Sequence, residues 1–163
     1  TVLVGLCFSL IGGIVAQGVR ANCSSDKSFW AAMNQVWVEF TKQEESLIIA
    51  AWMAKTQEQR NRGFQGVCPS LVSERSLLFV FPTQVSPKFH MVGVTLPLDI
   101  AFIDVSNRVI DIQRMNQQES SQPIRYYRPK LQVQFALEAL AGRLDQLRLN
   151  PGVWRMRILE KSQ

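Results

Sequence analysis

The clearest pattern of apolar and polar positions lies in the second half of the chain, over residues 89–112. Within it, side chains alternate so that one face is wholly apolar while the other begins with Asp99. That apolar face consists of Leu98, Ile100 and Phe102. A period of two predicts a β-strand. Turn-forming residues at 104–108 and a β-rich run from Val109 then predict a hairpin, which we take as the centre of the domain.

Further strands and two short helices are expected around this hairpin. Apolar or alternating runs predict strands at residues 47–53, 76–81, 131–137 and 153–159. Thr56 and Gln59 have the spacing of a capping box, which predicts a short helix that ends at Gly63 or Gly66. Leu144 and Leu147 indicate a second short helix. Residues 67–75 show no sustained period and are expected to form a polar connection.

The segment from residue 28 to residue 40 allows two structures. Phe29, Met33 and Phe40 recur at helical spacing, with Ser28 as a suitable N-cap. Residues 36–40, VWVEF, instead alternate and are rich in β-forming side chains, as in a strand. Both alternatives remain open at this stage.

The N-terminus begins with an uncharged apolar run over residues 2–16. This run is followed by Val19-Arg-Ala21, which is similar to the small-residue cleavage site of a secretory signal. Three interpretations follow: a cleaved signal, a retained membrane anchor over residues 2–19, or a buried segment of a soluble protein. The first two place the domain in the periplasm or another extracytoplasmic compartment, with anchoring in the inner membrane as one option.

Two cysteines follow the apolar run, and they fit an exported protein. Cys23 and Cys68 form an even pair that an oxidising compartment can join, although the sequence also allows two separate thiols. A zinc site is not expected, because His90 is the only histidine and no C-x-x-C pair exists. No cofactor is expected.

Composition indicates one globular domain with a basic surface. The 163 residues are 47% hydrophobic and 19% charged, which suits a packed core rather than disorder. The net charge of +5 is compatible with an anionic envelope partner, an unknown protein partner or the membrane itself, and also with a simply solvated basic surface. No dense Lys/Arg run occurs, so specific nucleic-acid binding is not expected.

The central pattern has recognisable flanks. They are residues 77–81, 89–91 and 96–104, with Thr56, Arg60 and Gly63 upstream and Ala136, Leu137, Glu138 and Gly142 downstream. Together these segments resemble the DUF192 family, a small prokaryotic domain of unknown function. The resemblance covers about residues 46–158. It implies a compact, mainly β domain with short helices and favours a strand at residues 36–40. It implies no settled activity.

One segment departs from the family pattern. Most members continue as Phe-Trp-Met-Lys-Asn-Thr, whereas this chain has FHMVGV from Phe89 to Val94. His90 replaces the tryptophan, and Val92 and Gly93 replace the lysine and asparagine. Any site that depends on that lysine or asparagine is therefore in doubt here.

We therefore expect an α+β, mainly β fold. It comprises a small, partly closed antiparallel sheet or barrel with two short helices, preceded by an N-terminal hydrophobic helix. The expected domains are a signal peptide or membrane anchor over residues 1–21, a linker and first helix or strand over 22–45, and a DUF192-like domain over 46–160.

Two groups of residues are candidate ligand-binding positions. Arg60 has the planar fork that binds carboxylates or phosphates, and it can equally pair with Asp99 at the edge of the core. His90 is the only imidazole, a group that titrates near neutral pH. The second group is Tyr126, Tyr127 and Arg128, aromatics among cations that suit a polyanion or a sugar, or else a charged β-edge.

Function is the least determined property. Catalytic motifs such as a nucleophile elbow, a phosphate loop or an H-E-x-x-H pair do not occur, so no catalytic residue is assigned. We expect an exported or membrane-tethered binding or accessory module. The alternatives are an accessory subunit of an envelope complex anchored by residues 2–19, and an enzyme whose pocket uses Arg60, His90 and Asp99.

Overall fold

The structure, a computed structural model, describes residues 23–24 and 28–159. The predicted hydrophobic helix, the cleavage site and the anchor lie outside these residues. Among the residues that are described, no helix is both long enough and apolar enough to cross a bilayer.

Seven strands form one sheet in the order β5-β4-β6-β3-β2-β1-β7. The strands are β1 (Asn34–Lys42), β2 (Glu45–Ala54), β3 (Ser76–Val85), β4 (Leu98–Ile103), β5 (Val109–Met115), β6 (Val133–Leu140) and β7 (Arg155–Leu159). Neighbouring strands are antiparallel except β2 and β3, which run parallel. The sheet is therefore mixed, whereas the sequence led us to expect an antiparallel one.

The parallel pair requires a crossover connection, and most of the helical structure lies there. Residues 55–75 leave β2, form α2 (Gln57–Arg62) and α3 (Pro69–Glu74), and return to β3. Thr56 and Gln59 make both bonds of the predicted capping box, and Gly63 ends α2. The expectation of an irregular connection at residues 67–75 was wrong. Pro69 begins α3, which is too short to show a helical period in the sequence.

The central hairpin is confirmed. β4 and β5 pair through a turn in which the Asp104 carboxylate accepts from the backbone N–H groups of Ser106 and Arg108, and Asn107 adopts a positive φ of 63°. All six residues of β4 are buried, because the sheet is covered on both faces. Leu98, Ile100 and Phe102 belong to one core cluster, whereas Ala101 and Ile103 belong to the other.

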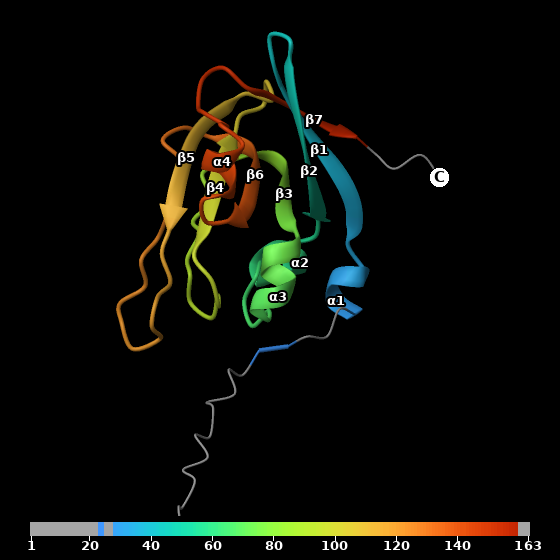
Figure 1. Cartoon of the computed structure of the whole chain (residues 1–163). Coiled ribbons are helices and arrows are strands. Elements are labelled where there is room, and N and C mark those ends of the chain that lie inside the picture. The colour runs from blue at the N-terminus through green and yellow to red at the C-terminus, as the bar shows by residue number, and fades with distance from the viewer. Residues whose placement is uncertain (1–22, 25–27, 160–163) are drawn as a thin grey trace, which may run out of the picture.

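The two core clusters lie on opposite faces of the sheet. The first contains Trp30, Phe64 and Leu71 from the helices and loops, while Leu144 and Trp154 cover the second. In Figure 1, α1 (Ser28–Ala31), α2 and α3 lie at the same end of the sheet. α4 (Arg143–Gln146) follows β6. This arrangement leaves the first face bordered by helices and long loops, where the candidate site lies.

One of the two alternatives left open is now decided, and two strand boundaries differ from expectation. The strand alternative for residues 36–40 is confirmed by β1, and the helix ends at Ala31. β3 continues past Pro82 to Val85 through an irregularity in its pairing with β6, so Pro82 does not end it. β6 begins at Val133, and Leu131 before it is exposed.

The sheet does not close into a barrel, but its two edge strands approach one another at one corner. Arg108, next to β5, bridges to Arg155 of β7, and Val109 N–H donates to the carbonyl of Trp154 at 3.0 Å. The predicted mainly β fold with short helices is thus confirmed. The sheet stays open, and its two edges meet no further than this corner contact.

Candidate functional site

A cavity of about 260 Å³ lies between α2, the loop before α3, the β3–β4 loop and the middle of the sheet. We call it the α2 cleft. Its lining residues are Arg60, Asn61, Arg62, Gly63, Phe64, Gln65, Phe79, Lys88, Phe89, His90, Val94 and Glu138. A second cavity of about 380 Å³ adjoins it and shares Arg60, Asn61, Phe79, Lys88 and Phe89. The two cavities form a depression with basic edges and phenylalanine walls.

Arg60 fastens α2 to the sheet. Its guanidinium donates to the backbone carbonyls of Lys55 and Val80, the second at 3.1 Å, and to the side chain of Gln57 at 3.0 Å. It also lies over the ring of Phe81, 5.7 Å from the centroid. Arg60 does not pair with Asp99, because these backbone carbonyls next to the helix engage its fork instead. Arg60 therefore holds α2 against the sheet at the edge of the cleft.

Glu138 is the unusual residue of the α2 cleft. It lies near the middle of β6 with Leu77 of β3 and Ile100 of β4 as its cross-strand partners, and it is only 5% exposed. Within the part of the chain that the structure describes, its carboxyl group has no hydrogen-bond partner and no ion pair. Burial raises the pKa of Glu138 to about 8. At neutral pH the group is therefore mainly a neutral acid, which can donate a hydrogen bond.

His90 connects the cleft to the second group of predicted residues. Its Nδ1 accepts from the backbone N–H of Val92 at 3.3 Å, which leaves Nε2 as the ring nitrogen without a hydrogen bond to Val92. Its ring meets the edge of Tyr126 at 6.3 Å between centroids. Lys88 and Arg128 also lie over Tyr126, at 5.8 and 5.9 Å. We call Lys88, His90, Tyr126 and Arg128 the Tyr126 patch.

Two predicted site residues lie elsewhere. Asp99 is 3% exposed at the start of β4, where it accepts from the backbone N–H of Gly142 at 2.7 Å and pairs with Arg114. Tyr127 is buried in the first core cluster, and its hydroxyl accepts from the backbone N–H of Asn116 at 3.1 Å. Arg60, His90, Tyr126 and Arg128 thus lie in one region, whereas Asp99 and Tyr127 serve the packing of the domain.

Glu138 was missed as a site residue by the sequence reasoning, although a signal existed. It is a single carboxylate inside the apolar run ALEAL, on a strand expected to pack between others. A charged group in such a run is either paired or functional. The sequence could not show that its partner is lacking, because that depends on how β3, β4 and α2 surround it.

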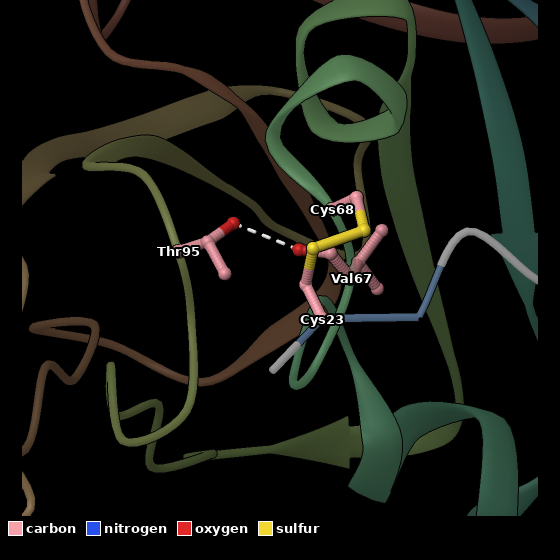
Figure 2. Close-up of a disulfide and its surroundings, with 4 residues drawn as sticks. All are labelled: Cys23, Val67, Cys68 and Thr95. Atoms are coloured by element: carbon pink, nitrogen blue, oxygen red, sulfur yellow. Dashed lines mark hydrogen bonds between the residues drawn. A yellow bond between two sulfur atoms is a disulfide. The ribbon is translucent and has the colours of Figure 1, made fainter. Parts of the chain in front are cut away.

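A disulfide joins Cys23 to Cys68, at the end of the loop whose residues Phe64 and Gln65 line the cleft (Figure 2). Its sulfur atoms join the N-terminal segment to the end of the loop that carries Phe64 and Gln65. Figure 2 also shows Thr95 donating to the carbonyl of Val67 at 2.8 Å. Gly66 N–H donates to the carbonyl of Gly93 at 2.8 Å. The loop between α2 and α3 is therefore fixed to the β3–β4 loop, which also lines the cleft.

The cleft as a whole is suited to anions. Arg60, Arg62 and Lys88 contribute positive charge, and the one carboxyl group in the lining, Glu138, is neutral at pH 7. No three histidine, cysteine, aspartate or glutamate side chains gather as metal ligands among the described residues. Phenylalanine rings supply apolar contact for the rest of a ligand.

Two solved structures share this fold. A candidate transcription regulator from Sinorhizobium meliloti 1021 superposes with a TM-score of 0.68 at 20% identity, over 77% of this chain and 95% of that chain. A protein of unknown function from Novosphingobium aromaticivorans gives a TM-score of 0.65 at 21% identity, over 76% of this chain and 84% of that chain. At these identities the likeness concerns the fold alone.

Sequence comparisons identify the family. A UPF0127 protein from Thermococcus sibiricus is 28% identical over 91 residues, which span 55% of this chain and 55% of the relative. The chain thus spans about half the length of that curated relative. The family model DUF192, described as an uncharacterised ACR, matches residues 38–155, a range that includes α2, the β3–β4 loop and Glu138. The chain belongs to the DUF192 family.

Proposed function

We propose that this protein is an exported binding module whose α2 cleft holds a small anion with an apolar portion. One observation carries the proposal: the buried carboxyl of Glu138 has no partner among the described residues and lies in a cavity edged by Arg60, Arg62 and Lys88. Burying a polar group without a partner costs free energy. A ligand that accepts its hydrogen bond recovers part of that cost.

The size and walls of the cleft limit the ligand. At about 30 Å³ for each water-sized group, 260 Å³ holds on the order of nine such groups. Phe64, Phe79 and Phe89 form apolar walls against which a ring or a short alkyl chain can pack. A compact aromatic or branched carboxylate, or a phosphate ester of similar size, matches both requirements.

The disulfide and the N-terminal run support the location of the module. A disulfide persists in oxidising compartments and is rare in the cytosol. The apolar residues 2–16 suit a secretory signal or an anchor. Cell fractionation combined with N-terminal sequencing tests this part: recovery from the cytosol with reduced Cys23 and Cys68 would contradict it. Retention of residues 2–19 in the membrane fraction would favour the accessory-subunit alternative.

The binding proposal is tested by titrating the detergent-solubilised full chain with four compounds of similar shape. Benzoate and phenyl phosphate are the anionic probes, and benzyl alcohol and benzylamine are the neutral and cationic controls. We expect saturable binding, seen by calorimetry, of at least one anion and of neither control. Binding of benzylamine in preference to both anions, or no binding of any anion, would overturn the proposal.

A matched pair of variants locates the binding site. Lys88→Gln removes a charge from the cleft, whereas Lys130→Gln removes one from an exposed position outside it. Both side chains are exposed, so neither change should alter stability. We expect anion affinity to fall by about threefold to tenfold in Lys88→Gln only, because the loss is that of one charge partly screened by solvent.

An enzyme is the second candidate, because Glu138 and His90 line the same cavity. A carboxyl group with a pKa of about 8 and an imidazole are both suited to transfer protons near neutral pH. Asp99, expected in such a pocket, is not among its lining residues. Recovery of every bound probe unchanged after long incubation, checked by NMR, favours the binding module. A product whose formation is lost in His90→Asn would favour the enzyme.

A further inference from the structure

We propose that Glu138 stays protonated in the complex and donates a hydrogen bond to the bound oxyanion, so that the α2 cleft takes its ligand only together with this proton. The inference rests on the proposed function, because it concerns the same cleft. It adds the chemical class of the group bound, an oxyanion with a free acceptor oxygen, and the condition under which binding stops.

The geometry leaves the carboxyl of Glu138 without a partner inside the sheet. Its cross-strand neighbours Leu77 and Ile100 are apolar and buried, and they offer no side-chain donor. The adjacent wall residues Phe64 and Phe79 are apolar as well. The open side of the carboxyl is therefore the cavity.

The nearby cations do not convert Glu138 into an ion pair. Charged and titratable groups reach the cleft from two elements: Arg60 and Arg62 from α2, and Lys88 and His90 from the β3–β4 loop. The Arg60 guanidinium is engaged by the carbonyls of Lys55 and Val80 and by Gln57. The four salt bridges found within residues 28–159 do not include Glu138. The positive charge at the rim of the cleft can therefore attract a negatively charged ligand.

A bound oxyanion and an ionised Glu138 exclude one another. Two negative groups that share a poorly solvated site repel, and the proton is retained between them. Below the pKa of Glu138 the protonated protein binds the anion directly, and no proton is exchanged. Above this pKa the ionised protein must take one proton from solvent for each anion bound, so charge and protons balance in both cases.

Burial raises the pKa of Glu138 to about 8, which sets the pH range in which binding changes. Affinity for a carboxylate such as benzoate, which stays ionised throughout, should be nearly constant from about pH 6 to about pH 7.5 and should fall by about tenfold for each further pH unit above the pKa. A bound anion raises the pKa of Glu138 further, so the complex remains protonated over this range.

The test is calorimetric titration of the full chain with benzoate and with phenyl phosphate across that pH range, in buffers of different ionisation enthalpy. We expect weakening above about pH 8 and uptake of about one proton for each bound anion near pH 9. The two probes show whether the site prefers a carboxylate or a phosphate ester, and either result is compatible with the proposal. Affinity that stays constant through pH 9 would overturn it.

Two variants separate Glu138 from its neighbours. Glu138→Gln keeps a hydrogen-bond donor but cannot ionise, so its affinity should be independent of pH and should exceed that of the unmodified chain above about pH 9. His90→Asn removes the imidazole and should leave the loss of affinity above pH 8 in place. If the loss persisted in the first variant or disappeared in the second, Glu138 would not be the controlling group.

A third measurement does not depend on the folding of any variant. Carbon-13 NMR of the glutamate side-chain carboxyls in the unmodified chain should show one group that titrates near pH 8 and moves to higher pH when the anion binds. A Glu138 signal that is already ionised at pH 7 would overturn this inference. An anion could still bind in that case. Failure of every anion to bind at any pH would overturn the proposed function as well.

Discussion

The Asp99 carboxylate accepts a hydrogen bond of 2.7 Å from the backbone N–H of Gly142, which joins the start of β4 to the turn after β6. Its other oxygen accepts from Arg114, whose guanidinium also reaches Asp145 at 3.0 Å. The hydrogen bond to Asp99 raises the pKa of Arg114. Asp99 therefore acts in a structural network rather than in the α2 cleft.

Asp99→Ala should destabilise the domain without changing anion affinity. The substitution leaves the Gly142 N–H unpaired in a partly buried position and removes the pairing with Arg114. We expect a loss of about 2–4 kcal/mol in the free energy of unfolding, measured in urea. Asp145→Ala is the control: its side chain is 75% exposed, so little stability should be lost. A loss of anion binding in folded Asp99→Ala would contradict this assignment.

The stability of the domain should decrease as the pH rises towards 8. Burial raises the pKa of Glu138 to about 8 in the folded protein, above its ordinary value of 4.5, so between these values the folded state holds a proton that the unfolded state has released. The slope of stability against pH from this group is therefore negative. At pH 7 the cost is of the order of 3 kcal/mol, at about 1.4 kcal/mol for each pH unit above 4.5.

Glu138→Gln removes this slope and provides the measurement. Its free energy of unfolding in urea should depend less on pH than that of the unmodified chain between about pH 5 and about pH 8. Glu39→Gln is a control, because Glu39 pairs with Arg157 at the protein surface. A parallel pH dependence in Glu138→Gln and the unmodified chain would show that burial does not hold the proton on this residue.

Removal of the disulfide should loosen one wall of the cleft. Cys23 and Cys68 are 45 positions apart in the sequence, and closure of a loop of that length stabilises a fold by about 2–4 kcal/mol. The double variant Cys23→Ser and Cys68→Ser should unfold at lower urea concentration and bind anions more weakly. Addition of a reductant should affect the unmodified chain in the same way and leave the double variant unchanged. Equal stability of the two proteins would mean that the bond does not constrain the domain.

Arg60→Lys should release α2 from the sheet even though the charge is kept. A lysine cannot make the three bonds that the guanidinium of Arg60 makes to Lys55, Val80 and Gln57. We expect a loss of about 1–2 kcal/mol and faster hydrogen exchange in α2. Arg108→Lys, at an exposed position in the β4–β5 turn and away from α2, is the control. Identical exchange rates in the two variants would argue against a fastening role for Arg60.

The Tyr126 patch should contribute to contacts with extended anionic polymers. Tyr126 is 48% exposed, so Tyr126→Ala should leave stability almost unchanged while lowering retention on a polygalacturonate column. Tyr127→Phe is the contrasting variant, because its ring stays buried and only the hydrogen bond to Asn116 is lost. Retention that does not change in Tyr126→Ala would assign the patch to surface packing alone.

The sequence predicts the central hairpin because its signals are local. Alternation in β4, the Asp104 turn and the β-rich start of β5 all lie within the range 98–115. The capping box of α2 is equally local and was predicted correctly. The parallel pairing of β2 and β3 was not predicted, because strand direction depends on the path of residues 55–75 rather than on any side-chain period.

The candidate site was only partly predictable for a similar reason. Arg60 and His90 stand out by residue type, and they do line one cavity. Asp99 is also a conspicuous carboxylate, but it is engaged by Gly142 in the turn after β6, 43 positions away, and by Arg114 of β5. Glu138 is conspicuous for the opposite reason: its surroundings supply no partner. Both facts belong to the tertiary structure.

The segment that connects β2 to β3 determines which ligands the module can bind. Residues 55–75 are the return path between the two parallel strands, and part of that path, from Arg60 to Gln65, is also a wall of the recess. A deletion or insertion there would leave the strands paired and alter the dimensions of the recess. Selectivity in this architecture can therefore diverge by changes in connector length, without substitution of any strand residue.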